Sequence, residues 1–253
     1  MSQVDIAPRW GEIMQRYTEY ATLESLHSMC VTKTPDKLQL GAVMPGNPPR
    51  VTDVEKRQVD RALLKAGAVE PRGGPLVIDM DLDAFPRTCQ CHKHTCCDEC
   101  WSAFMPIARR VTEYWLKEVW SFERILCVFS GCRGVHYWIL DDRVISWSAA
   151  QRVSFIKSIM VPVDRTGIIP RFMSQEQWAA HYPRYDEAVT ASVAHLKGLP
   201  LMPHQKTRRL SVPLPPVDGP FTWLPEQHAH RPLQVTPDMV NVWIERACKV
   251  LGL

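Results

Sequence analysis

The stretch PLVIDMDL, residues 75–82, gives the clearest indication of the fold. It follows a Gly-Gly break and is apolar until its acidic residues begin, which is typical of a buried β-strand. Residues two apart on a strand point to the same face, so Asp79 and Asp81 are expected to lie side by side. A buried strand should not end in paired charges unless they have a partner, such as a divalent metal. The alternative is a solvated strand end, which the further acid Asp83 favours.

The spacing of apolar residues predicts that helices and strands alternate along the rest of the chain. Helices are expected at residues 8–29, 52–65, 102–119, 148–160, 175–181, 186–196 and 236–251, and further strands at residues 37–43, 124–129, 135–140 and 209–212. Thr52 begins a capping-box pattern, and Pro237 stands in the first turn of the last helix. This order of elements predicts an α/β or mixed α+β fold.

The composition is that of a globular domain with a substantial core. The chain has 253 residues, of which 45% are hydrophobic and 23% charged, and its formal net charge is +3. These values exclude a disordered, collagen-like or coiled-coil chain, and no apolar run reaches the ~18 residues of a membrane helix. No secretory signal is visible at the N-terminus, so secretion is not expected. The mildly basic charge permits a nucleic-acid partner without requiring one.

A cysteine-rich loop, CQCHKHTCCDEC, occupies residues 89–100. Without an export signal, a metal site explains this cluster better than disulfides or free buried thiols. Cysteines spaced Cys-x-x-Cys bind Zn²⁺ tetrahedrally, and such sites are usually structural. Cys97 and Cys100 have this spacing. The other two ligands are expected from Cys89 and Cys91, with Cys96, His92 and His94 as alternatives.

Three later segments carry groups that suit a phosphate or a helix start. SGCRGVH, residues 130–136, brackets Arg133 with glycines, so the arginine can fork onto a phosphate to which His136 also donates; the alternative is a simple turn. HQKTRR, residues 204–209, is a basic cluster that suits a triphosphate or a template backbone, although such clusters are usually solvated. Asp186, in PRYDEAVT, stands where a helix begins and fits an N-cap.

Together and in this order, these segments resemble the small, catalytic subunit of the archaeal and eukaryotic type of DNA primase. The resemblance rests on LVIDMDL, CDECW, FSGCRGVHYW, PRYDEAVT and HQKTRRLSVP, with KLQLGAV as a further family-like strand, and it covers residues 37–213 with gaps. It implies a primase catalytic fold in a single domain over residues 1–253, with an embedded zinc motif at about residues 86–101 and a reduced helical insertion at about residues 148–183.

The resemblance also implies an activity and the residues that carry it. The protein would be a nucleotidyltransferase, a DNA-directed RNA polymerase that synthesises short RNA primers on single-stranded DNA for replication by a two-metal mechanism. The aspartates that would hold two Mg²⁺ or Mn²⁺ ions are Asp79, Asp81 and Asp186. The residues that match nucleotide contacts are Ser130, Arg133, His136, Lys197 and His204. The residues that match the structural zinc ligands are Cys89, Cys91, Cys97 and Cys100.

The chain departs from the family pattern at Cys132, where the family usually has a second arginine, so its hold on phosphate is expected to be weaker. The segment between His136 and Asp186 and the region before residue 37 are also short. The partners that the resemblance implies are a single-stranded DNA template, ribonucleoside triphosphates, a primase large subunit and a replicative DNA polymerase complex. The expected location is the nucleus of a eukaryote, the cytoplasm of an archaeon or the host cell of a virus.

Three other functions fit part of the pattern. A primase-polymerase of the same superfamily, acting in repair or viral replication, would share the aspartates and the phosphate loop but use deoxynucleotides. A non-catalytic zinc-containing module that binds nucleic acid or protein would explain the cysteines and the basic cluster but not the three aspartates. A metal-dependent nuclease would use the carboxylates without needing the arginine and histidine of the phosphate loop.

Overall fold

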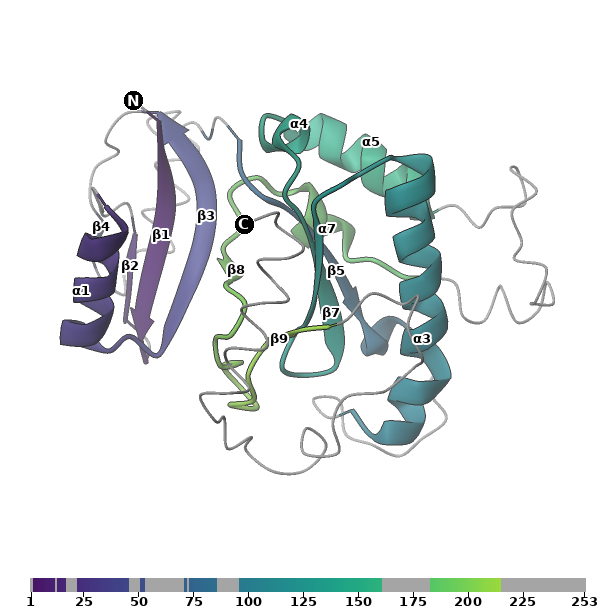
Figure 1. The fold of residues 1–253 in the computed structure, drawn as a ribbon, viewed down its shortest axis with the longest axis horizontal. Helices are drawn as coiled ribbons and strands as arrows, with labels where there is room; N and C mark the ends of the chain where they lie inside the picture. Colours follow the sequence, from purple (N-terminus) through teal and green to yellow (C-terminus); the bar gives the residue numbers. More distant parts are fainter. Residues whose placement is uncertain are drawn as a thin grey trace.

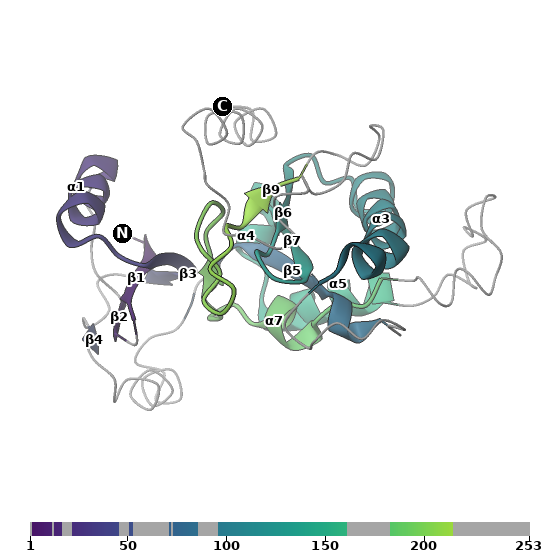
Figure 2. The same cartoon turned by 90° about the horizontal axis from the view of Figure 1, so that it is seen from below.

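The computed structural model describes residues 2–11, 13–16, 22–45, 51–52, 71, 73–85, 96–160 and 183–214. Within this part of the chain, two antiparallel sheets lie next to each other, and the second sheet stands between the first sheet and a long helix (Figures 1 and 2). The mixed α/β architecture predicted from the sequence is therefore confirmed. The helices predicted at residues 52–65, 175–181 and 236–251 lie outside the described residues, apart from Thr52, which belongs to a strand.

The first sheet has the strand order β4-β2-β1-β3-β8. Its strands are β1(Ser2–Trp10), β2(Ile13–Arg16), β3(Lys37–Pro45), β4(Val51–Thr52) and β8(Lys197–Gly198), and helix α1(Leu23–Lys33) lies between β2 and β3 in the chain. β3 confirms the strand predicted at residues 37–43. β8 comes from much later in the chain and pairs with β3 at Gln39↔Gly198 and Leu40↔Lys197, which links the first sheet to the rest of the molecule.

The helix predicted at residues 8–29 is wrong, because this region holds a hairpin followed by a shorter helix. Trp10 pairs with Ile13 across the hairpin, so apolar residues three positions apart meet as they would on a helix face. Gly11 forms the turn with a φ of +55°, in the left-handed region that favours glycine. α1 begins only after Thr22, whose side chain forms a capping box.

The second sheet has the strand order β5-β7-β6-β9. Its strands are β5(Leu76–Asp81), β6(Ile125–Phe129), β7(Gly134–Ile139) and β9(Val212–Pro213). The first three confirm predicted strands with small differences at their ends. β9 begins later than the strand expected at residues 209–212, because Leu210 forms an isolated bridge with Pro203 instead.

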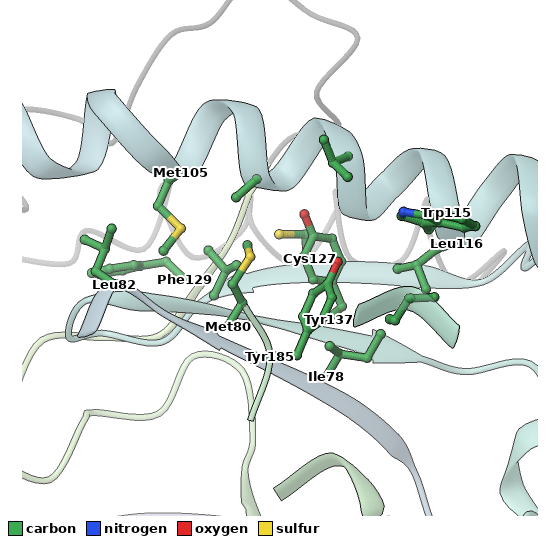
Figure 3. Packing of buried hydrophobic residues seen from close by; sticks show 14 of the residues in the cluster. Ile78, Met80, Leu82, Met105, Trp115, Leu116, Cys127, Phe129, Tyr137 and Tyr185 are labelled. Carbon is green, nitrogen blue, oxygen red and sulfur yellow. The ribbon is translucent and has the colours of Figure 1, made fainter. Parts of the chain in front are cut away.

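Helix α3(Asp98–Tyr114) packs along one face of the second sheet and ends in a π-helical turn, η2(Trp115–Val119). It confirms the helix predicted at residues 102–119, although it starts earlier. Ile78 and Met80 of β5 are fully buried beneath this helix (Figure 3). Since side chains alternate along a strand, Asp79 and Asp81 face the opposite side of the sheet.

The start of β5 is held by a buried arginine. Helix α5(Ala149–Met160), which confirms the helix predicted at residues 148–160, follows the short helix α4(Asp142–Ile145). The guanidinium of Arg152 donates to the carbonyl oxygens of Gly74 and Pro75 at 2.6 and 2.9 Å. These bonds fix the strand that carries the two aspartates.

The remaining helical pieces are short. A 3-10 turn, η1(Leu82–Ala84), follows β5, and α7(Glu187–Ala191) is shorter than the helix predicted at residues 186–196. The backbone becomes extended at Ser192 and then enters β8. None of the described helices combines the length and the apolar character needed to cross a membrane.

Candidate active site

A cavity of about 310 Å³ lies between the two sheets, on the face of β5 opposite α3. Its charged lining residues are the acids Asp79 and Asp81 and the bases Lys37, Arg133, Lys197 and Lys206. The cationic groups suit a highly charged anion, whereas the paired carboxylates suit a cation. The cavity can therefore accept an anion that arrives together with positive ions.

β5 directs two carboxylates into this cavity. Burial raises the pKa of Asp79 to about 6, and the charge of Asp186 adds to the rise, while Arg133 and Lys197 oppose it. Burial also raises the pKa of Asp81, against the opposing effect of Arg133. Both carboxylates thus stand in surroundings that disfavour their negative charge, and a nearby cation would relieve this effect.

Asp186 lies beside Asp79 although the two are far apart in the sequence. Its backbone N–H donates to the carbonyl oxygen of Asp79 at 2.8 Å, and the preceding residue, Tyr185, forms a β-bridge with Met80. Asp186 is also the N-cap of α7, because its Oδ1 accepts the N–H of Val189 at 2.9 Å. The predicted N-cap is confirmed, and the same residue is brought next to the aspartates of β5.

The three aspartates supply the hard oxygen donors that Mg²⁺ and Mn²⁺ prefer. As the side chains stand, no group of three or more His, Cys, Asp or Glu residues in the described part of the chain could hold a metal ion. Asp81 is turned onto Arg133, and Asp186 is turned into the cap of α7. Asp186 does not line the cavity, so a cation shared by all three aspartates would require these two side chains to rotate away from their present partners.

Arg133 joins two acids at the edge of the cavity. Its Nε lies 2.9 Å from Oδ2 of Asp81, and its Nη2 lies 2.8 Å from Oδ2 of Asp83. Asp83 thus belongs to the same ion-pair cluster as Arg133 and Asp81, although the sequence pattern indicated only a solvated acid. Because its guanidinium is already paired, Arg133 would have to share its five N–H donors between carboxylate and phosphate in order to contact the predicted phosphate.

Ser130 organises the turn that carries Arg133. Its Oγ accepts the N–H of Cys132 at 3.3 Å and the N–H of Gly134 at 3.2 Å. The hydroxyl accepts in both bonds, so its own proton can be donated to a ligand oxygen. Cys132 also lines the cavity, and its buried thiol cannot supply the positive charge of the arginine that the family usually has there.

The two predicted phosphate-binding segments pack together into one wall of the cavity. Gly131, with a φ of +82°, touches the second segment so closely that a Cβ there would lie 2.7 Å from the carbonyl oxygen of Arg209 and 2.9 Å from Cβ of His204. Thr207 Oγ1 donates to the carbonyl oxygen of Gly131 at 2.6 Å. Glycine is required here because any larger side chain would separate the two turns.

His204 is held by the turn that follows it. Its Nδ1 accepts the backbone N–H groups of Lys206 and Thr207 at 3.3 and 3.4 Å, so the ring proton belongs on Nε2. Burial, with help from nearby cations, lowers the pKa of His204 to about 4. The ring is therefore a neutral hydrogen-bond donor at pH 7.

His136 and Lys197 both line the cavity that receives Asp79. His136 Nε2 lies 3.7 Å from Oδ1 of Asp79, and because burial lowers the pKa of His136 to about 4, this contact is not an ion pair at neutral pH. Lys197 is only 5% exposed, and its Nζ donates to the carbonyl oxygens of Val189 and Ser192 at 3.3 and 3.1 Å. Burial lowers its pKa to about 7. Both residues line the cavity, as a nucleotide contact requires.

Some lining residues were not among the predicted site residues, namely Lys37, Gln39 and His195, whereas Lys206 belongs to the predicted basic cluster. Lys37 and Gln39 alternate along β3, so the sequence does indicate that they share a face. No sequence signal indicates that this face turns toward β5. Burial lowers the pKa of Lys37, with a further contribution from Arg9.

The predicted zinc site lies only partly within the described residues, which do not include Cys89, Cys91, His92 and His94. Cys97 is the N-cap of α3, and its Sγ accepts the N–H of Cys100 at 3.5 Å. Cys96 and Cys100 are buried nearby. Three cysteines thus lie at the N-terminus of α3. The complete ligand set stays a prediction.

Paired carboxylates that face a cationic wall across a cavity form a site suited to a nucleotide with its metal ions. The sequence model of the DNA primase small subunit family matches residues 78–216, which is more than half of the chain. The chain therefore belongs to the DNA primase small subunit family. The match includes β5 from Ile78 onward, the turn of Arg133, Asp186 and the segment of His204.

The chain is similar to curated DNA primase small subunits from several eukaryotes. It is 29% identical to that of Saccharomyces cerevisiae over 153 residues, which is 60% of this chain and 34% of the yeast protein. The identity is 30% with that of Schizosaccharomyces pombe over 150 residues, 58% of this chain and 30% of the relative, and 32% with that of Drosophila melanogaster over 132 residues, 51% and 27% respectively. The chain thus spans about a third of the length of these relatives.

Proposed function

We propose that this chain is a primase catalytic subunit, a nucleotidyltransferase that synthesises short RNA primers on single-stranded DNA. The observation that carries the proposal is that Asp79 and Asp81 line a cavity together with four basic side chains, while the backbone N–H of Asp186 bonds to Asp79. Membership of the DNA primase small subunit family supports it. A binding module without catalysis would not need three carboxylates at one place.

The residues of the site divide the work between them. The three aspartates hold two Mg²⁺ or Mn²⁺ ions, which supply a lower pKa for the attacking 3′-hydroxyl and charge neutralisation for the leaving pyrophosphate. The groups that orient the triphosphate are Ser130, Arg133, His136, Lys197 and His204. Catalysis in this proposal depends on positioning and charge stabilisation, with no covalent intermediate on the protein.

The zinc motif and the partners are part of the same proposal. Cys97 and Cys100, with Cys89 and Cys91, bind a structural Zn²⁺ that clamps the loop before α3. The relatives are named small subunits, so we propose a primase large subunit as the partner, with a replicative polymerase complex beyond it. Because these relatives are eukaryotic, we propose the nucleus as the location. We also propose that the chain forms a single catalytic domain with a reduced helical insertion.

Primer synthesis on single-stranded DNA tests the proposal. The full chain, with and without a candidate large subunit, is given ribonucleoside triphosphates and Mg²⁺ or Mn²⁺. We expect short RNA products from the parent, none from Asp81→Asn or Asp186→Asn, and retained synthesis by Asp142→Asn, whose exposed carboxylate on α4 lies outside the cavity lining. Synthesis by the first two variants, or none by the parent in any condition, contradicts the proposal. Parallel reactions with deoxynucleotides distinguish a primase from a primase-polymerase.

A further inference from the structure

A buried hydroxyl on α3 lies where the two acid-bearing segments meet the core. Thr112 is fully buried, and its Oγ1 is 2.7 Å from the carbonyl oxygen of Ala108 and 2.9 Å from the hydroxyl oxygen of Tyr185. The same Oγ1 lies 4.0 Å from the sulfur of Met80. Met80 stands between the two aspartates of β5, and Tyr185 immediately precedes Asp186.

The available protons fix the direction of the bond between Thr112 and Tyr185. A threonine hydroxyl has one proton, and the carbonyl oxygen of Ala108 can only accept, so that proton belongs to the bond with Ala108. The hydroxyl of Tyr185 therefore donates to Oγ1 of Thr112. Tyr185 is only 6% exposed, and breaking this bond would leave a buried polar group without its partner.

Tyr185 connects this core contact to the carboxylate next to it. Its side chain lies in the core below α3, near Met80 and Ile78 (Figure 3). Its backbone forms the β-bridge with Met80, and the next N–H, that of Asp186, bonds to the carbonyl oxygen of Asp79. The side chain anchors the segment on one face of the sheet, and the carboxylate follows directly after it.

This anchor matters because the segment of Asp186 has little backbone pairing. β5 is held to β7 by a continuous ladder from Leu76↔Ile139 to Asp81↔Gly134. At the other edge of β5, the segment of Asp186 forms an isolated bridge at Tyr185 in place of a continuous ladder. A side-chain bond into α3 therefore contributes a larger share of the order of this segment than it would in a full strand.

We propose that Tyr185 and Thr112 are positioning residues that hold Asp186 beside Asp79, so that the carboxylates of the two segments can bind one divalent cation together. This inference rests on the proposed function, because it assumes that Asp79 and Asp186 bind the metal. Tyr185 and Thr112 would support that site without touching nucleotide or metal. It predicts that removing either hydroxyl weakens metal binding without removing any metal ligand.

The test is the affinity of the full chain for Mn²⁺, which does not require catalysis. The electron paramagnetic resonance signal of the free ion measures how much Mn²⁺ is bound. Tyr185→Phe and Thr112→Val each remove one hydroxyl, and Thr112→Ser keeps it. Asp186→Asn is the reference for loss of the carboxylate itself. Tyr137→Phe is the matched control, because Tyr137 is also fully buried and donates to α3, at 3.4 Å to the carbonyl oxygen of Arg109, but lies on β7, which is paired along both edges.

We expect Tyr185→Phe and Thr112→Val each to weaken the affinity for Mn²⁺ about tenfold. The double variant should bind no more weakly than either single variant, because the two changes remove the same bond. Thr112→Ser and Tyr137→Phe should bind as the parent does. All measurements are made well below the melting temperature of each variant, so that unfolded chain does not contribute.

The other outcomes separate this inference from the proposed function. Affinity equal to the parent's in Tyr185→Phe, together with weakened binding in Asp186→Asn, overturns the positioning role and leaves the proposed function standing. Equal weakening by Tyr137→Phe also overturns it, since any lost core hydroxyl would then have the same effect. If Asp186→Asn binds Mn²⁺ as tightly as the parent does, both the metal site of the proposed function and this inference are wrong.

Discussion

The backbone N–H of Asp186 donates a 2.8 Å hydrogen bond to the carbonyl oxygen of Asp79, which brings together acidic residues from two distant segments. The charge of Asp186 is, after burial, the second cause of the raised pKa of Asp79. The fold thus holds these carboxylates together against their mutual repulsion. Such a local conflict is typical of a functional site, where the rest of the structure compensates for it.

Asp79→Asn should abolish primer synthesis and at the same time stabilise the fold. Burial raises the pKa of Asp79 to about 6, so at pH 7.5 its charge costs more free energy in the folded protein than in the unfolded chain. Each unit of pKa difference corresponds to about 1.4 kcal/mol, and the side chain is partly hydrated, so we expect a gain of about 1–2 kcal/mol in the free energy of unfolding. Denaturant titration in metal-free buffer measures it.

The pH dependence of this gain checks its cause. A carboxyl group with a raised pKa in the folded state contributes stability below its unfolded-state pKa and loses it as the pH rises through about 6. The advantage of Asp79→Asn should therefore vanish at pH 4. The control is Asp142→Asn, whose carboxylate is exposed and should change stability little. A destabilised Asp79→Asn at pH 7.5 would mean that burial does not disfavour the charge.

Gly131→Ala should weaken both the fold and nucleotide binding. The new Cβ would lie 2.7 Å from the carbonyl oxygen of Arg209, and the alanine backbone would have to keep a φ of +82°. Gly11→Ala is the matched control, since Gly11 has a φ of +55° but open space around its Cβ. We expect a loss of about 1 kcal/mol for Gly11→Ala from backbone strain alone, and about 2–3 kcal/mol for Gly131→Ala.

Unfolding and ribonucleotide binding are measured for both glycine variants. Only Gly131→Ala should bind the nucleotide more weakly, because only this change separates the two turns that form the cavity wall. If both variants lose the same stability and bind nucleotide equally well, the close approach of Gly131 to Arg209 contributes nothing to the site.

His204→Asn should make the protein less sensitive to acid. The folded-state pKa of about 4 lies below the usual value near 6.5, so between these values the unfolded chain binds a proton that the folded protein does not. This contribution to stability is present above pH 6.5 and is lost as the pH falls toward 4. Asparagine offers an oxygen to the N–H groups of Lys206 and Thr207 in place of Nδ1, but it does not titrate.

The comparison is the free energy of unfolding at pH 7 and pH 5. We expect the decrease between them to be about 1 kcal/mol smaller in His204→Asn than in the parent, since solvent reaches much of the ring and screens its surroundings. The exposed His27 on α1 provides the control substitution, His27→Asn, which should follow the parent. Identical pH profiles for the parent and His204→Asn would contradict the lowered pKa.

The second sheet could be predicted from the sequence because its strands are short, nearly continuous apolar runs and α3 has an unbroken apolar stripe. The hairpin of the first sheet could not, because Trp10 and Ile13 have the same spacing on a helix face and across a tight turn. The turn at Gly11 has a left-handed φ, and a glycine in the sequence does not reveal its φ.

In the candidate site, too, the sequence predicts local relationships but not contacts between distant segments. The pairing of Asp79 with Asp81 follows from the alternation of a strand, which is local. Asp186 could be placed beside them only through the family resemblance, because its contact with Asp79 joins distant segments. Lys37 was missed for that reason too: the packing of β3 against the cavity is decided by tertiary structure, through β8 and the Gly73 bridge to Val43.

Cys97→Ser should distinguish the helix cap from a metal site. Serine is a favoured N-cap, so the variant keeps an acceptor for the N–H of Cys100 and loses only the sulfur atom. If the loop binds structural Zn²⁺, the free energy of unfolding falls by about 3 kcal/mol or more, because such a site contributes directly to folding. A chelator should lower the stability of the parent toward that of the variant, and Cys30→Ser, on α1, should behave as the parent does. If Cys97→Ser unfolds with the parent and the chelator has no effect, α3 begins stably without zinc, and these cysteines have another role.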